Sequence, residues 1–434
     1  MSLPGFTVDI DHNPYLPLGS RDVSAVVTVT ADASGDAPAS VSDGVGSAEI
    51  IIIDCSGSMD SPRTKMIEAR AATSAAIDVV HDGVSFAVIA GTSLARQVYP
   101  TGGTMAIASA QTRAEAKRAV AGLQPNGGTA IGKWLRLARQ LFETSPAALR
   151  HAILLTDGKN QHETSEQLDE AIALAEGYFS CDCRGVGTDW EVSEIRRITT
   201  ALLGTVDIVP DPTGLAADFE AMMRGAMSKQ VADVVLRVWT PQHAAVKFVK
   251  QVAPAIDDLT GRRVQSGPQA GDYPTGAWAP GESRDYHVGV DVSPAGVGAE
   301  MLAARVSLVA TSPGGQQILG QGLVRATWTE DEALSTRIAT GVAHYTGQAE
   351  LADAIQEGLE ASKRGDEETA TSKLGRAVQL AHVAGNEDTA RLLSKVVDVV
   401  DEATGTVRLK RKVAAADEMA LDTRSTKTVR VKKE

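Results

Sequence analysis

The sequence contains few of the residues that stabilise small secreted proteins. Only three cysteines occur among 434 residues, and Cys181 and Cys183 are separated by a single residue. This number and spacing exclude a disulfide scaffold and suit a reducing compartment. Aromatic residues make up only 4% of the chain. The core must therefore consist mainly of Val, Ile, Leu and Ala.

Long apolar runs are also absent from the sequence. None approaches the ~18 residues that a membrane-spanning helix needs. The first residues have neither the basic start nor the apolar centre of a secretory signal. We therefore expect a cytoplasmic protein without a transmembrane segment. Apolar residues at 43% and charged residues at 22% are typical of a globular protein, and the length allows two or three domains.

The charge is unevenly distributed along the chain. The net charge is −13, yet residues 405–434 contain nine Lys and Arg against four acids. The rest of the chain is therefore strongly acidic, which argues against nucleic-acid binding by the body of the protein.

Residues 47–229 alternate between apolar strand-like runs and helix-period segments. Runs such as "AEIIIID", "VSFAVIAGT" and "RHAILLTDG" are apolar throughout, and amphipathic stretches lie between them. Continuous apolar strands separated by helices are typical of a mostly parallel sheet that is covered on both faces. We therefore predict a doubly wound, Rossmann-like α/β domain.

The segments on either side of this domain have different patterns. Residues 230–329 contain short alternating strands with Gly and Pro turns, which predict a β-sandwich. Residues 1–46 contain two strands and a small-residue linker, and two strands cannot bury a face alone. We therefore expect them to join the later strands, so that the α/β domain is inserted into the sandwich. The pattern of residues 330–404 predicts an α-helical domain, which is either a hairpin similar to a tetratricopeptide repeat or a plain bundle. Residues 405–434 are predicted to form a flexible basic tail.

Oxygen-bearing side chains follow the apolar strands of the α/β domain. Asp54, Ser56 and Ser58 end the first strand in "IIIIDCSGSMD", Asp157 ends the strand in "ILLTDGKN", and Thr129 lies in the Gly-rich loop "NGGTAIG". In open α/β sheets, ligands bind at the carboxyl ends of the strands. Taken singly, each Ser or Asp could be a turn or cap residue. Together they form an all-oxygen set that suits a hard cation such as Mg²⁺.

This set resembles the metal-ion-dependent adhesion site of von Willebrand factor type A domains. The family's D-x-S-x-S pattern is matched by "DCSGS", its later Thr by Thr129 and its Asp by Asp157. The resemblance implies bound Mg²⁺ (or Mn²⁺ or Ca²⁺), with hydroxyl ligands from Ser56, Ser58 and Thr129 and with Asp54 and Asp157 acting partly through water. It also implies a bacterial interaction protein, a scaffold in a signalling or stress complex, whose partner supplies an Asp or Glu to the ion.

Enzymatic alternatives lack necessary residues. A phosphatase of the haloacid dehalogenase type needs a second Asp two positions after the first, where Ser56 stands. A serine hydrolase needs the G-x-S-x-G turn, and the Gly-rich loops lack P-loop or dinucleotide-binding spacing. We therefore predict a non-enzymatic protein, and a divalent-metal-dependent hydrolase is the least favoured alternative.

The basic C-terminal segment raises a second functional hypothesis. Thr423, Thr426 and Thr428 lie among Arg and Lys and are candidate phosphorylation sites for a Ser/Thr kinase. A phosphothreonine there could be bound by a forkhead-associated domain. A solubilising tail, an electrostatic tether to nucleic acid or anionic membrane, and pairing of the tail with the acidic body remain alternatives.

Overall fold

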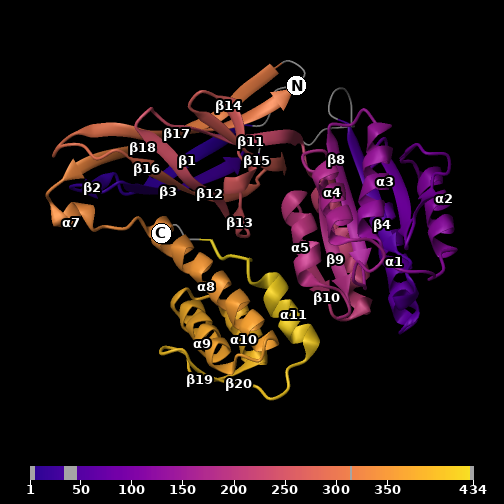
Figure 1. The fold of residues 1–434 in the computed structure, drawn as a ribbon. Helices are drawn as coiled ribbons and strands as arrows, with labels where there is room; N and C mark the ends of the chain where they lie inside the picture. The colour runs from indigo at the N-terminus through magenta and orange to yellow at the C-terminus, as the bar shows by residue number, and fades with distance from the viewer. Residues whose placement is uncertain (1–4, 34–45, 313–314, 431–434) are drawn as a thin grey trace. The chain divides into compact units, whose positions relative to one another are not determined.

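The computed structural model describes residues 5–33, 46–312 and 315–430 (Figure 1). The chain divides into two compact units. One unit comprises residues 36–232, and the other comprises residues 1–35 together with 233–434. The two units are described separately below.

The first unit contains a mixed sheet of seven strands in the order β10-β9-β8-β4-β5-β6, with β7 also paired to β5. The strands β10, β9, β8, β4 and β5 run parallel to one another, whereas β6 and β7 are antiparallel to β5. Their bounds are β4 Ser47–Asp54, β5 Ser85–Gly91, β6 Ala95–Tyr99, β7 Ala106–Ile107, β8 Leu149–Thr156, β9 Ser180–Val186 and β10 Val206–Val209.

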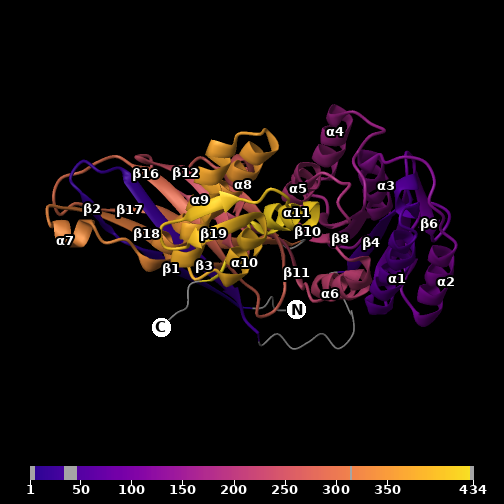
Figure 2. The same ribbon diagram turned by 90° about the horizontal axis from the view of Figure 1, so that it is seen from below.

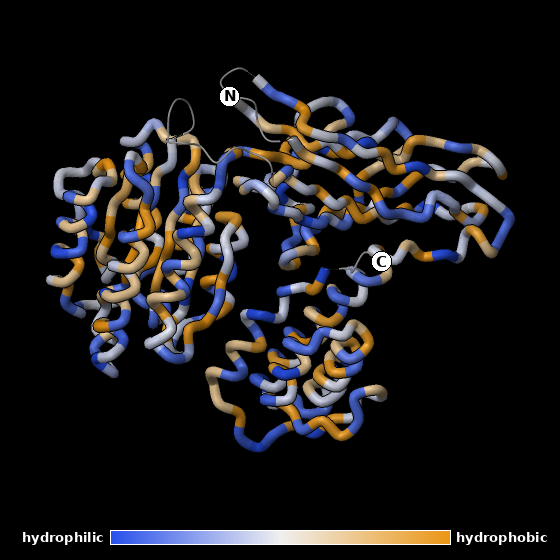
Figure 3. Tube along the Cα trace, turned by 180° about the vertical axis from the view of Figure 1, so that it is seen from behind, coloured by the Kyte–Doolittle hydropathy of each residue, from blue (hydrophilic) through white to orange (hydrophobic). Residues whose placement is uncertain are grey.

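Helices cover both faces of this sheet. Figure 2 shows α1 and α6 on one face and α3, α4 and α5 on the other. Figure 3 shows hydrophobic residues along the central strands and mixed hydropathy along the helices. The predicted doubly wound, mostly parallel α/β domain is therefore confirmed. The helices are α1 Thr64–Val79, α2 Ala110–Ala121, α3 Ile131–Glu143, α4 Ser165–Ala175, α5 Val192–Ala201 and α6 Leu215–Met227, with 3₁₀ turns at Gly57–Asp60 and Pro212–Gly214.

The second unit contains two further sheets, ordered β1-β3-β16-β12-β13 and β14-β15-β11-β17-β18-β2. Strand β3 pairs with β16, and β2 pairs with β18, so segments before and after the α/β unit share both sheets. The rings of Phe6 and Trp278, one from each sheet, make an edge contact at 5.6 Å. The bounds are β1 Phe6–His12, β2 Tyr15–Pro17, β3 Asp22–Ala31, β11 Val231–Trp239, β12 Ala244–Ala253, β13 Asp257–Asp258, β14 Val264–Gly267, β15 Ala270–Trp278, β16 Ser283–Val292, β17 Glu300–Ser312 and β18 Gly315–Thr329, with a 3₁₀ turn at Thr260–Arg262.

Helices follow these sheets, as the sequence predicts. They are α7 Glu332–Ser335, α8 Thr340–Lys363, α9 Glu367–Val383 and α10 Glu387–Val396. The breaks at "RGD" and "AGN" contain Gly365 and Gly385, both with positive φ. Asp366 and Asn386 follow these glycines and accept hydrogen bonds from the first turns of α9 and α10. Glycine thus ends one helix and a polar cap begins the next.

The predicted flexible tail is wrong for residues 405–430. A hairpin of β19 (Val397–Asp401) and β20 (Thr406–Leu409) crosses the predicted domain end at residue 404, and α11 (Ala415–Arg424) follows it. The amide of Thr428 then donates to the carbonyl of Pro254 at 3.1 Å. The guanidinium of Arg430 binds the carboxylate of Asp285 through two nitrogens. The basic segment is ordered because its charges and backbone groups find partners that are distant in sequence.

We expect His287 to make the stability of the second unit dependent on pH. It lies on β16 with its ring edge-on to Phe248, at 4.9 Å between centroids. Its Nε2 has no hydrogen-bond partner among the described residues. Burial, together with the charge of Lys250, lowers the pKa of His287 to about 4.

This shift predicts a loss of stability in mild acid. The unfolded chain takes up a proton near pH 6.5, whereas the folded chain resists it until about pH 4, so stability falls as the pH decreases through this interval. The full loss is roughly 3 kcal/mol. We expect His287→Leu to lose less stability than the wild type between pH 7 and pH 4, as measured by urea unfolding of the full chain. Equal slopes for the two proteins would contradict this prediction.

Candidate metal centre

The first predicted ligand ends the central strand of the α/β sheet. Asp54 closes β4, which lies between β5 and β8, and it is completely buried. Its Oδ1 accepts a hydrogen bond from the Ser56 amide at 2.7 Å, and its Oδ2 accepts one from the Thr156 hydroxyl at 2.7 Å. Burial raises the pKa of Asp54 to about 6, although these hydrogen bonds act in the opposite direction. The carboxylate is therefore fixed in orientation and poorly solvated, which favours pairing with a cation.

A chain of hydrogen bonds connects the serines to the second carboxylate. The hydroxyls of Ser56 and Ser58 are 2.9 Å apart, and Ser58 donates to Oδ1 of Asp157 at 2.6 Å. Asp157 follows β8 directly and is as buried as Asp54. The loops after β4 and β8 are thus joined by side chains that all carry oxygen.

Thr129 lies beside this chain. A Cβ atom placed on Gly158 would be 3.3 Å from the Thr129 hydroxyl and 3.4 Å from the Ser58 hydroxyl. The hydroxyls of Thr129 and Ser58 therefore both lie next to Gly158. The Thr129 carbonyl accepts the amides of Gln161 and His162, which ties its loop to the loop after β8. All five residues predicted from the sequence are located at one edge of the sheet.

The side chains of two further residues contact the carboxylates of this set, and neither was predicted from the sequence. Thr156 orients Asp54, as described above. Lys65, in the first turn of α1, places Nζ at 2.7 Å from Oδ2 of Asp157 and at 3.2 Å from Asp189. Burial alone would lower the pKa of Lys65, but the hydrogen bonds and charges of both aspartates raise it. Lysines at helix starts are usually solvated, so the sequence gives no signal for this contact.

The chemistry of this set fits a hard divalent cation. Two carboxylates and three hydroxyls offer oxygen atoms only, and Mg²⁺ prefers oxygen ligands and keeps several waters. Among the described residues, no group of three or more His, Cys, Asp or Glu side chains is placed to hold a metal. A cation at this edge would therefore depend on the hydroxyls and on water.

Comparison with known proteins identifies the family. A family model for the von Willebrand factor type A domain matches residues 48–208. The solved structure of a von Willebrand factor type A protein from Catenulispora acidiphila is 54% identical, covers 99% of this chain and 98% of its own, and superposes with a TM-score of 0.93. The chain belongs to the von Willebrand factor type A family. This family of domains mediates protein interactions.

A more distant structure shares the fold of the von Willebrand factor type A (VWA) protein. The crystal structure of the ArnB paralog VWA2 from Sulfolobus acidocaldarius is 14% identical, with a TM-score of 0.59, over 97% of this chain and 98% of its own. No curated protein matches the sequence. In the described residues, no helix is long and apolar enough to cross a membrane.

The C-terminal part of the VWA protein matches a second family model. The von Willebrand factor type A C-terminal domain spans residues 379–425. This range runs from the end of α9 through the β19–β20 hairpin to α11, so it crosses the domain end predicted at residue 404. The core of this region joins residues from α8, α9 and α10 to Val407 of β20 and Leu421 of α11.

The candidate phosphorylation sites of the VWA protein do not lie on a flexible tail. Thr423 is 1% exposed, and its hydroxyl donates to the Met419 carbonyl within α11. The Thr428 hydroxyl donates to the Val252 carbonyl at 2.6 Å. Thr426 is half-buried, and its carbonyl accepts the amide of Ile256. A kinase would have to break these hydrogen bonds to reach the hydroxyls of Thr423 and Thr428.

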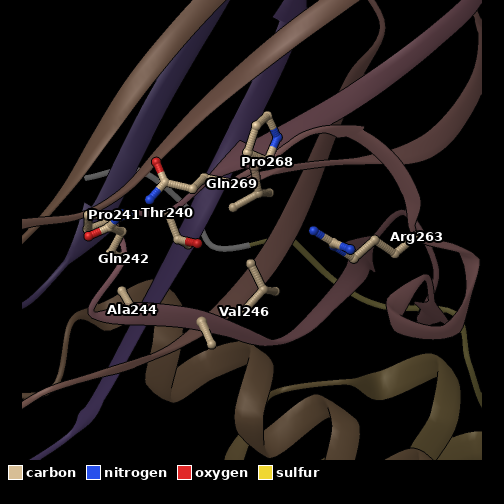
Figure 4. Close-up of a pocket in the computed structure, with 10 residues that line it drawn as sticks. Thr240, Pro241, Gln242, Ala244, Val246, Arg263, Pro268 and Gln269 are labelled. Carbon is tan, nitrogen blue, oxygen red and sulfur yellow. The ribbon is translucent and has the colours of Figure 1, made fainter.

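A separate pocket of about 780 Å³ lies on the second unit (Figure 4). Strands β11 and β12 and the segments around β14 form its walls. Figure 4 shows Arg263 extending into it from the side opposite Gln242. Among the described residues that line the pocket, none is an acid, histidine or cysteine. The pocket therefore does not have the ligands of a metal centre.

Proposed function

We propose that this VWA protein is a metal-dependent, non-enzymatic protein-binding module. Mg²⁺ (or Mn²⁺ or Ca²⁺) binds at the carboxyl edge of the sheet, and an Asp or Glu of a partner protein completes its coordination. The proposed ligands are Asp54, Ser56, Ser58, Thr129 and Asp157. The observation that carries this proposal is the hydrogen-bonded chain from Ser56 through Ser58 to Asp157.

The charges at this edge favour an acidic partner. Two buried carboxylates supply the only negative charges of the proposed ligand set, and one of them also pairs with Lys65. Hydroxyl ligands are neutral, so a divalent ion there keeps much of its charge. A carboxylate from another protein is the ligand that best compensates this charge.

Several features support a non-enzymatic role. Ser56 occupies the position where a phosphatase needs its second Asp. Cys55, between Asp54 and Ser56, is buried, and burial together with the charge of Asp54 raises its pKa to about 12. A thiol in this state is not a nucleophile at neutral pH. The edge of the sheet offers ligands for a cation but no activated nucleophile.

The remaining parts of the chain fit a scaffold. We interpret the two sheets of the second unit as a β-sandwich into which the VWA domain is inserted along the chain. The sandwich would serve as a platform for the VWA domain, and the whole protein as a scaffold in a bacterial signalling or stress complex. The cytoplasmic location stays a prediction. The alternative of a phosphothreonine adaptor is weaker, because Thr423 and Thr428 use their hydroxyls in internal hydrogen bonds.

Affinity capture from the source cell tests this proposal. The tagged full-length chain is incubated with lysate in Mg²⁺ or in EDTA, and the bound proteins are compared by mass spectrometry. We expect a set of partners that is retained with Mg²⁺ and reduced at least about tenfold by EDTA, since loss of one strong ligand bond exceeds ~1.4 kcal/mol.

Two variants make this test specific. Asp54→Ala, or Asp54→Asn if the alanine variant does not fold, should lose the same partners in Mg²⁺. Asp60→Ala is the matched control, because Asp60 lies in the same loop but is exposed and pairs with the exposed Arg63. Partners that are insensitive to both EDTA and Asp54 substitution would contradict the proposed function.

A further inference from the structure

Lys65 is a buried cation at the edge where the divalent ion is proposed to bind. Its side chain is only 6% exposed, and its ammonium group contacts Oδ2 of Asp157 at 2.7 Å. The other oxygen of the same carboxylate accepts the hydrogen bond from Ser58. Asp157 is therefore shared between the hydroxyl chain and a fixed positive charge.

The surrounding loops hold the ammonium group in this position. Asp189, in the loop after β9, contacts Nζ at 3.2 Å. Gly187 has a positive φ, and a Cβ atom there would lie 3.4 Å from Cε of Lys65. The backbone of this loop thus passes close to the methylene groups of the lysine side chain. Lys65 connects α1 with the loops after β8 and β9, and it does so next to the proposed ligands.

A charge in this place must affect cation binding. Lys65 adds one positive charge beside the two buried carboxylates of Asp54 and Asp157, and it shares this charge with the exposed Asp189. A divalent ion that approaches Asp157 is repelled by the ammonium group, and burial of the pair limits screening by water. Removing the positive charge while keeping the two aspartates should therefore strengthen ion binding.

We propose that Lys65 is an affinity-determining residue that weakens the binding of the divalent ion by competing with it for the carboxylate of Asp157. This inference rests on the proposed metal-dependent function. The ion is then held loosely by the VWA protein alone, and a carboxylate from a partner supplies the missing negative charge. Lys65 is a positioning residue and not a ligand, because its ammonium group has no lone pair.

Titration of the purified full-length chain with Mn²⁺, monitored through the electron paramagnetic resonance signal of free Mn²⁺, tests this inference. Lys65→Met removes the charge at similar length, and Lys65→Gln removes it but keeps a hydrogen-bond donor toward Asp157. Both should bind Mn²⁺ at least about tenfold more tightly than the wild type, because a buried like charge is removed. Lys65→Arg keeps the charge and should stay within about threefold of the wild type.

A matched control removes a lysine that is close in sequence to Asp157. Lys159 is exposed and pairs with Glu191, outside the proposed ligand set. Lys159→Met changes the net charge by the same amount and should leave Mn²⁺ affinity unchanged. Thermal unfolding of the metal-free proteins is a second readout. Lys65→Met should unfold at a lower temperature than the wild type, and saturating Mn²⁺ should raise this temperature more than it does in the wild type.

The possible outcomes separate this inference from the function on which it rests. Tighter Mn²⁺ binding by Lys65→Met and Lys65→Gln, with Lys159→Met unchanged, supports it. Equal or weaker binding by both charge-removing variants overturns the role of Lys65 but leaves the metal site intact. Absence of Mn²⁺ binding in the wild type and in every folded variant overturns the proposed function and this inference together.

Discussion

Replacing His151 by leucine is expected to destabilise the VWA domain by about 3–5 kcal/mol, since it leaves a buried charge without its partner. His151 lies on β8 between two acids. Its Nδ1 is 2.8 Å from Glu49 of β4, and its Nε2 is 3.0 Å from Asp182 of β9. Burial alone would lower the pKa of His151, but the two carboxylates raise it to about 10. The ring is therefore a cation at neutral pH.

The expected loss has a defined origin and a pH signature. The side chain of Glu49 is 3% exposed, and burial raises the pKa of this carboxyl even with His151 present. Without the imidazolium, Glu49 must be protonated or remain an unpaired charge. Its folded pKa is raised, so the stability that it contributes is present in acid and is lost as the pH rises. The wild type also loses stability as the pH rises, because the unfolded chain releases the His151 proton near pH 6.5 while the folded chain keeps it to about pH 10. Both the wild type and His151→Leu should consequently be less stable at pH 8 than at pH 5.

Urea unfolding of the full chain at these two pH values measures this effect. The double variant Glu49→Leu with His151→Leu is the control, because replacing both partners by apolar groups is often close to neutral. It should recover most of the lost stability. A loss below about 1 kcal/mol in His151→Leu would show that the three side chains act as an ordinary surface ion pair.

Replacing Asp285 by alanine is expected to release the C-terminal segment and to cost about 2–4 kcal/mol, since it removes charged hydrogen bonds at a buried position. Asp285 lies on β16 and is 5% exposed. It accepts hydrogen bonds from the hydroxyl of Tyr345 on α8 and from the guanidinium of Arg430. One carboxylate thus joins a sheet, a helix and the end of the described chain.

Hydrogen exchange measures the release directly. The amide of Ile256 donates to the carbonyl of Thr426, and the amide of Thr428 donates to that of Pro254. Both amides should lose protection in Asp285→Ala. Asp291→Ala is the control, because Asp291 is also an acid on β16 but pairs with the exposed Arg21. Unchanged protection of Ile256 and Thr428 in Asp285→Ala would contradict this role.

The location of the candidate metal centre could be predicted because most of its ligands directly follow apolar runs that are recognisable in the sequence. Asp54 and Asp157 each follow an apolar run that can only be a buried strand, and parallel strands end at one edge of the sheet. Ser56 and Ser58 also lie within four residues of the end of β4, whereas Thr129 lies in the loop before α3. The contacts of Lys65 and Thr156 could not be predicted in this way. Each depends on the orientation of one side chain toward a residue from another strand or loop.

The ordered structure of the C-terminal segment could not be predicted from the sequence for a similar reason. Nine basic residues in residues 405–434 are typical of a solvated tail. The partners that order the segment lie far away in sequence, such as Asp285 for Arg430, and nothing in the tail itself indicates them. Helix breaks at Gly365 and Gly385, in contrast, depend on glycine and cap residues next to each other, and these were predicted correctly.

The central claim is that two buried aspartates and three hydroxyls bind one divalent ion, and a count of bound ions tests it most directly. Equilibrium titration with Mn²⁺ should give about one ion per wild-type chain, displaced by excess Mg²⁺. Asp54→Asn, which removes the charge but keeps the size of the side chain, should lose this ion. A folded Asp54→Asn variant that binds Mn²⁺ with the affinity and stoichiometry of the wild type would contradict the account.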